Sequence, residues 1–152
     1  MTIPRNLSVL AGFAGASNTP TMNLPNIGEV ITVSATQATG TINYDCITQS
    51  QIYYTATAIA NWTVNFRGNA TTSLNSFMAV GQSVTVAFMV TQGATAFYNS
   101  AVTIDGNAVT PKWQGGAAPT FGNASSVDIY VYNIVKTGSA AFTVFASQTA
   151  FA

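Results

Sequence analysis

The chain has 152 residues, of which 48% are hydrophobic and only 5% are charged, with four cations, four anions and a net charge of zero. Soluble domains usually carry about 25% charged residues, so Ser, Thr, Asn, Gln and Gly must supply most of the polar surface. Four scattered cations cannot neutralise a phosphate backbone, which excludes nucleic acid as a partner. No apolar run reaches the roughly 18 residues that span a bilayer, so no membrane partner is expected either.

A surface with so few charges gives little electrostatic repulsion between molecules and favours association. The composition therefore predicts a protein that works in an assembly; a secreted monomer, or one adapted to acid or salt, is the alternative. The single cysteine, Cys46, excludes an internal disulfide framework. Because Cys46 ends a strand-like run, we predict a small buried apolar residue and not a reactive thiol.

Residues 1–28 contain three prolines and three glycines and show neither helical nor strand periodicity. A structureless stretch of this length does not belong inside a compact domain, so we predict an extended N-terminal arm over residues 1–28. Its apolar residues need a surface to lie on, either a neighbouring subunit or the flank of the same chain. The candidate anchors are Ile3, Leu7, Leu10 and Phe13.

A β pattern begins at Glu29 and continues through short runs of β-branched and aromatic residues separated by polar turns. The predicted strands of this part are residues 29–36, 41–47, 51–58 and 62–66. In the last of them Trp62, Val64 and Phe66 alternate with polar residues and are predicted to point inward. Residues 71–79 form the only predicted helix, of about two turns, with Leu74, Phe77 and Met78 capping the core.

The clearest strand lies within residues 80–90, where Val84, Val86, Phe88 and Val90 occupy one face of an extended chain. A hairpin is predicted over residues 101–110, with a loop at either Asp105-Gly106 or Gly106-Asn107. The second choice is preferred because it sets Ile104 opposite Val109 and so pairs like with like. Pro111 should then end the pairing or confine it to a sheet edge.

Residues 114–126 are predicted to form a loop, followed by strands at 127–136 and 140–147. One face of the first strand carries Val127, Ile129, Val131 and Val135, and the other carries Asp128, Tyr130, Tyr132 and Ile134. About eight short strands at regular spacing predict a single all-β domain over residues 29–152. We expect an antiparallel β-sandwich or jelly roll with at most one short helix.

The sequence contains no histidine, so the commonest general base and metal ligand is absent. The four carboxylates are far apart in the chain, and no spacing brings two into a catalytic pair or several into a calcium loop. No glycine-rich loop precedes a helix, as a phosphate site would require. We therefore predict no enzyme activity and no catalytic, cofactor-binding or metal-binding residues.

Aromatic residues are the remaining candidates for a site. Trp113 stands beside Lys112 and before a glycine-rich loop, while Tyr130 and Tyr132 lie on one face of a predicted strand. Exposed together, these three rings could stack on sugar rings. The alternative is that Trp113 packs in the core or at a subunit interface, as large aromatic residues usually do.

Several segments resemble a known family. The opening Met1-Thr2-Ile3-Pro4-Arg5-Asn6-Leu7-Ser8 resembles the start of virion structural proteins from tailed phages of marine cyanobacteria. From Trp62 onward the chain is similar to a module of such proteins that is often labelled tail-fibre-like. The segments that carry this likeness are Val80-Gly81-Gln82-Ser83, Asp105-Gly106, Pro111-Lys112-Trp113 and the closing run from Phe142 to Thr149.

This resemblance implies a non-enzymatic component of the virion and transfers no site residues. A 152-residue chain has no room for a fibre shaft, so we expect a capsid decoration or cement protein on the particle exterior. Its expected partners are other virion proteins, namely the major capsid protein or tail proteins, and further copies of itself. The alternative is a tail-fibre tip or surface module that binds a host glycan.

Overall fold

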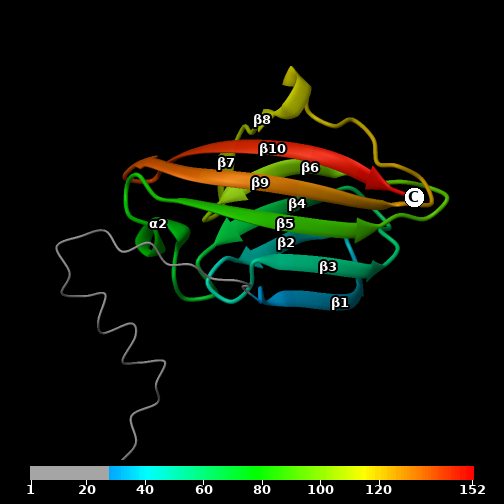
Figure 1. Cartoon of the computed structure of the whole chain (residues 1–152), viewed down its shortest axis with the longest axis horizontal. Helices are drawn as coiled ribbons and strands as arrows, with labels where there is room; N and C mark the ends of the chain where they lie inside the picture. The colour runs from blue at the N-terminus through cyan, green and yellow to red at the C-terminus, as the bar shows by residue number, and fades with distance from the viewer. Residues whose placement is uncertain (1–27) are drawn as a thin grey trace, which may run out of the picture.

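Two facing β-sheets form the protein in the computed structural model, which describes residues 28–152 (Figure 1). One sheet has six strands in the order β1-β3-β5-β9-β10-β8, and the other has four in the order β2-β4-β6-β7. The elements are β1 (Ile31–Gln37), β2 (Gly40–Asp45), β3 (Gln51–Ala56), β4 (Trp62–Arg67), α2 (Leu74–Phe77), β5 (Ser83–Thr91), β6 (Asn99–Ile104), β7 (Asn107–Val109), β8 (Lys112–Trp113), a 3-10 turn (Gln114–Gly116), β9 (Val127–Gly138) and β10 (Ala141–Phe151). The predicted all-β sandwich is thus confirmed.

The first six strands alternate between the two sheets, so the chain winds like a flattened coil. Each turn of this coil adds a strand parallel to the one before it, as in β1–β3–β5 and β2–β4–β6. The antiparallel arrangement predicted for the sandwich, and with it the jelly roll, is therefore wrong for this half of the chain. Parallel and antiparallel strands share the same two-residue alternation, so that pattern carries no information about strand direction.

The second half of the described chain is antiparallel except at β8. The long strands β9 and β10 form a hairpin and extend the larger sheet, with β9 also paired to β5. On the other sheet β6 and β7 form a short hairpin. Pro111 follows it, and the chain then crosses to the larger sheet, where β8 pairs in parallel with β10. The prediction that Pro111 ends the pairing of the returning strand is confirmed.

The loop of the β6–β7 hairpin is Asp105-Gly106, which corrects the preferred prediction of Gly106-Asn107. The register pairs Ile104 with Asn107 and Val102 with Val109. Asp105 and Gly106 have φ angles of 50° and 81°, as the two central positions of a tight hairpin turn require. Turn geometry therefore outweighs the gain from pairing Ile104 with Val109.

Large aromatic side chains fill the space between the sheets. Trp62, Val64 and Phe66 point inward from β4 as predicted, and Val86, Phe88 and Val90 point inward from β5. The Trp62 ring stacks on Phe88, with ring centroids 5.9 Å apart, so the two layers interlock through these residues. Such aromatic pairs add about 0.5–1.5 kcal/mol beyond the area that they bury.

The helix α2 is a single turn held at both ends by charged side chains, and it is shorter than the predicted helix over residues 71–79. The Asp105 carboxylate accepts hydrogen bonds from the N–H groups of Leu74 and Asn75, at 2.7 and 2.9 Å. Lys136 Nζ donates to the carbonyls of Asn75 and Met78. Leu74 and Met78 are buried as predicted, but Phe77 is 45% exposed, so its predicted role in the core is wrong.

Replacing Lys136 with methionine should lower the free energy of unfolding by about 2–4 kcal/mol, since each unsatisfied buried carbonyl costs about 1–3 kcal/mol. Lys136 is only 7% exposed and is the donor to both carbonyls. Equilibrium urea denaturation measures the change. Lys112→Met is the matched control, because Lys112 is exposed and its Nζ lies 5.9 Å from the centre of the Phe145 ring. Equal losses in the two variants would contradict this role of Lys136.

Candidate interaction surfaces

All the charged side chains of residues 28–152 except the exposed Lys112 have hydrogen-bond or ion-pair partners within the fold. Arg67 pairs with Asp45 across β2 and β4, with Nε 2.5 Å from Oδ1. Glu29 accepts hydrogen bonds from Ser50 and Gln51, and Asp105 and Lys136 hold α2 as described above. Within this part of the chain no three His, Cys, Asp or Glu residues come together as a metal site would require. The remaining surface is therefore mostly uncharged, and contacts with a partner there must be apolar or through neutral polar groups.

Cys46 follows β2 and is half-buried, close to the predicted environment. Burial, followed by the nearby carboxylate of Asp45, raises the pKa of its thiol from 9.0 to about 12. The thiol therefore stays protonated at neutral pH, and it is the thiolate that reacts with electrophiles and metals. This agrees with a packing role.

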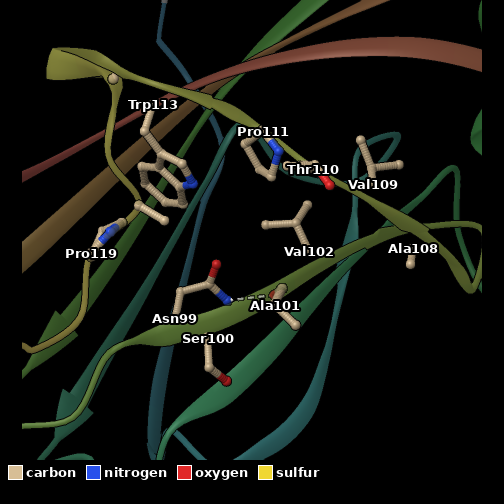
Figure 2. A pocket seen from close by; sticks show the side chains of 12 residues that line it. Asn99, Ser100, Ala101, Val102, Ala108, Val109, Thr110, Pro111, Trp113 and Pro119 are labelled. Carbon is tan, nitrogen blue, oxygen red and sulfur yellow. Dashed lines mark hydrogen bonds between the residues drawn. The ribbon is translucent and has the colours of Figure 1, made fainter.

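A pocket of about 410 Å³ lies where the two sheets part, between β6 and β7 on one side and β8 with its following loop on the other (Figure 2). The ring of Trp113 forms one wall, with Pro119 beside it, and Val102 stands in the middle. Asn99 and Ser100 from β6 lie on the side opposite the Trp113 backbone. The lining residues lie between positions 99 and 119, on β6, β7, β8 and the loop that follows, and no sequence motif signals that they enclose a pocket.

Tyr130 and Tyr132 do not join Trp113 in an exposed platform, which corrects the arrangement considered from the sequence. Both tyrosines are fully buried and lie beneath Trp113, whose ring meets theirs edge-on at centroid distances of 6.4 and 6.1 Å. Their hydroxyls bond to Asn99: Tyr132 Oη donates to Asn99 Oδ1, and Tyr130 Oη accepts from the Asn99 N–H. The inward face of β9 is thus the tyrosine face. Only Trp113, which is half-buried, remains available to a ligand.

The free edge of β1 is a second candidate surface. β1 ends the six-stranded sheet, opposite β8 (Figure 1), so within residues 28–152 its outer edge has no neighbouring strand. Val30, Ile31 and Val33 are exposed there, Val33 by 63%. The predicted arm anchors Ile3, Leu7, Leu10 and Phe13 lie outside the described residues, as does the predicted arm up to residue 27.

No family model, curated protein or solved structure matches the chain. Among residues 28–152 no helix is long and apolar enough to cross a membrane. Function is therefore inferred from the two surfaces just described, from the composition and from the resemblance noted in the sequence.

Proposed function

We propose that this chain is a structural protein of a phage particle, most specifically a capsid decoration protein on the particle exterior. It would attach to a neighbouring virion protein, the major capsid protein or a tail protein, through apolar and backbone contacts. The observation that carries the proposal is the free, apolar edge of β1, which residues 1–27 directly precede.

An unpaired strand edge presents a row of N–H and C=O groups that can pair with a strand of another chain. Proteins that must avoid such pairing place charges or prolines on the edge. β1 has the sequence Ile-Thr-Val-Ser-Ala-Thr-Gln and contains neither. Its first four residues, Ile31 to Ser34, run in regular register with β3, so the open side is a straight template for an added strand.

The charge pattern supports attachment without ion pairs. The chain carries no net charge, and the charged residues of the described part, apart from the exposed Lys112, are engaged within the fold. Attachment of this kind stabilises the assembled state by mass action, because it binds assembled neighbours and not free subunits. The likeness of residues 1–8 and of the segments from Trp62 onward to phage structural proteins points in the same direction.

The Trp113 pocket favours the second candidate, a tail-fibre tip or surface module that binds a host glycan. An aromatic wall with a few polar groups nearby is the usual form of a small-ligand site, and sugar rings stack on such walls. Here the wall is Trp113, and Ser100 and Thr110 are polar groups of the lining. A decoration protein would be found on the capsid, whereas this alternative places the chain on the tail.

Occupancy on the particle tests the proposal. Particles made without this protein are incubated with purified full-length variants, and cryo-electron microscopy measures both position and occupancy. Replacing Ile3, Leu7, Leu10 and Phe13 by serine, or Val33 by lysine, should weaken binding at least about tenfold, equivalent to about 1.4 kcal/mol. Thr41→Lys, on the exposed side of the other sheet, is the control and should bind normally. Density on the tail, or unchanged occupancy in both test variants, would contradict the proposal.

A further inference from the structure

The outward face of the six-stranded sheet has no charged residue on any of its five long strands. Inward residues such as Val86, Phe88 and Tyr130 alternate with the outward ones, so the strand pattern defines this face. The outward residues are Ile31 and Val33 of β1; Gln51, Tyr53 and Thr55 of β3; Ser83, Thr85, Ala87, Met89 and Thr91 of β5; Val127, Ile129, Val131, Asn133, Val135 and Thr137 of β9; and Thr143, Phe145, Ser147, Thr149 and Phe151 of β10.

The strand register gathers the apolar members of this face into a continuous row. Val33 is opposite Tyr53, Tyr53 is opposite Met89, and Met89 is opposite Ile129, so four apolar side chains follow one another across four strands. Side chains opposite each other on neighbouring strands are in contact range. Scattered apolar residues on a surface are ordinary, but a contiguous apolar row of this kind marks an interaction site.

The outward face of the smaller sheet shows what a solvated face of this protein looks like. There Asn65 Nδ2 donates to Asn43 Oδ1 at 2.8 Å, and Thr103 Oγ1 donates to Asn65 Oδ1 at 2.8 Å. The Asp45–Arg67 ion pair continues the same face. The outward face of the smaller sheet is therefore a ladder of polar groups, whereas the outward face of the larger sheet is uncharged and mixes Ile, Val, Met and Phe with neutral polar residues, among them Asn133, which donates to Thr85 Oγ1. The inward face of the larger sheet already packs on the core, and apolar residues that gather on the second face of a sheet are usually covered by another layer.

We propose that this apolar face is a dimer interface, on which a second copy of the chain stacks its own identical face. Five strands about 4.8 Å apart and about 30 Å long make a surface of roughly 700 Å². This is close to the roughly 800 Å² per partner of a standard protein interface. Two sheets so stacked lie about 10 Å apart, the ordinary spacing in a sandwich.

A second copy suits this face better than a different partner because the face offers no charge for an oppositely charged surface to recognise. Two uncharged copies meet without repulsion, and a twofold interface uses the same patch on both. The nearest cation is Lys112, on β8 at the margin, where its Nζ lies 5.9 Å from the Phe145 ring centre. Charges at the rim and their absence at the centre are typical of protein interfaces. The isolated chain should form this dimer without any other virion protein.

Sedimentation velocity of the full-length chain tests the dimer. Val131 is near the middle of the face and 38% exposed, so a lysine there can be accommodated in the monomer but not between two stacked faces. We expect the unmodified chain to dimerise and Val131→Lys to raise the dimer dissociation constant at least about tenfold. Thr41→Lys places the same charge on the polar face and should leave the dimer intact.

Met89→Glu is the second test variant, in case Val131→Lys fails to fold, and circular dichroism with a urea midpoint checks the fold of each. Met89 belongs to the same face, on the neighbouring strand β5. A monomeric unmodified chain at about 100 μM, near the weak end of functional dimer affinities, would overturn the proposal. Folded Val131→Lys and Met89→Glu chains that dimerise as tightly as the original would also overturn it. So would a dimer that only Val33→Lys disrupts, since that result indicates pairing through the β1 edge.

Discussion

Replacing Asp128 with alanine should lower the free energy of unfolding by about 3–5 kcal/mol, because several buried donors lose their acceptor at once. Asp128 is fully buried on the inward face of β9. Its carboxylate accepts hydrogen bonds from Gln92 Nε2 at 3.0 Å, from the Asn123 N–H at 3.0 Å and from Asn123 Nδ2 at 2.6 Å. Hydrogen bonds to carboxylates are each worth about 1.5–3 kcal/mol.

The same substitution should loosen two loops together. Gln92 also binds Phe97, its Nε2 donating to the Phe97 carbonyl at 2.7 Å and its Oε1 accepting from the Phe97 N–H at 3.0 Å. Asp128 therefore links the segment 93–98 to the segment 117–126 through one buried network. Native-state hydrogen exchange should show faster exchange in both segments of the Asp128→Ala chain.

Asp45→Ala is the matched control for this stability measurement by urea denaturation. Asp45 also lies on a strand and has a partner, Arg67, but the two side chains are 28% and 27% exposed. Ion pairs that water can reach contribute about 0–1 kcal/mol, so this variant should lose less than Asp128→Ala, whose side chain is fully buried. If Asp128→Ala proved no more destabilising than Asp45→Ala, the buried network would not hold the loops.

The second large effect is a steep loss of stability above pH 10. Burial raises the pKa of the Tyr44, Tyr130 and Tyr132 hydroxyls above their ordinary value of 10.0. Above that pH the unfolded chain releases these three protons while the folded chain keeps them, so the unfolded state binds fewer protons and is favoured as pH rises. Each tyrosine contributes a slope of about 1.4 kcal/mol per pH unit, or about 4 kcal/mol for the three.

Urea unfolding at a series of pH values from 9 to 12 measures this slope, which reaches its full value once the tyrosines of the unfolded chain are ionised, above about pH 11, and tyrosinate absorbance follows the ionisation. Cys46 adds to the slope from lower pH, since the pKa of its thiol rises from 9.0 to about 12 on folding. Tyr44→Phe should remove about 1.4 kcal/mol per pH unit from the slope. Its stability at pH 7 should hardly change, because the Tyr44 hydroxyl has no hydrogen-bond partner within the described part of the protein. An unchanged slope in Tyr44→Phe would contradict the assignment.

Strand faces could be predicted from the sequence wherever apolar and polar residues alternate, as at Trp62, Val64 and Phe66. In β9 the alternation separates Tyr130 and Tyr132 from Ile129 and Val131, but both faces carry large side chains. Periodicity alone cannot tell which face enters the core, so the sequence leaves the two tyrosines as candidates for the surface. The apolar outward face that caused this ambiguity is the one now proposed to bind a second copy.

Features that depend on distant parts of the chain could not be predicted. The parallel winding of β1 to β6 leaves no local signal, because each strand finds its neighbour only in the next turn. The Trp113 pocket joins Asn99 and Val102 of β6 to Pro119, which lies in the loop after β8. The position of the β6–β7 loop depends on the positive φ angles of Asp105 and Gly106. The pairing of like residues across the hairpin, on which the sequence prediction rests, does not reveal those angles.

The coiled path of the first six strands also constrains the order in which the protein can fold. Strands adjacent in sequence lie in opposite sheets from β1 to β6, so residues 31–91 contain no hairpin that could form early. Among residues 28–152, strands that follow one another in the chain pair only at β6–β7 and β9–β10. Since contacts distant in sequence form slowly, we expect the C-terminal half to nucleate folding, and a nascent chain emerging from a ribosome must keep its N-terminal half unpaired until that nucleus has been made.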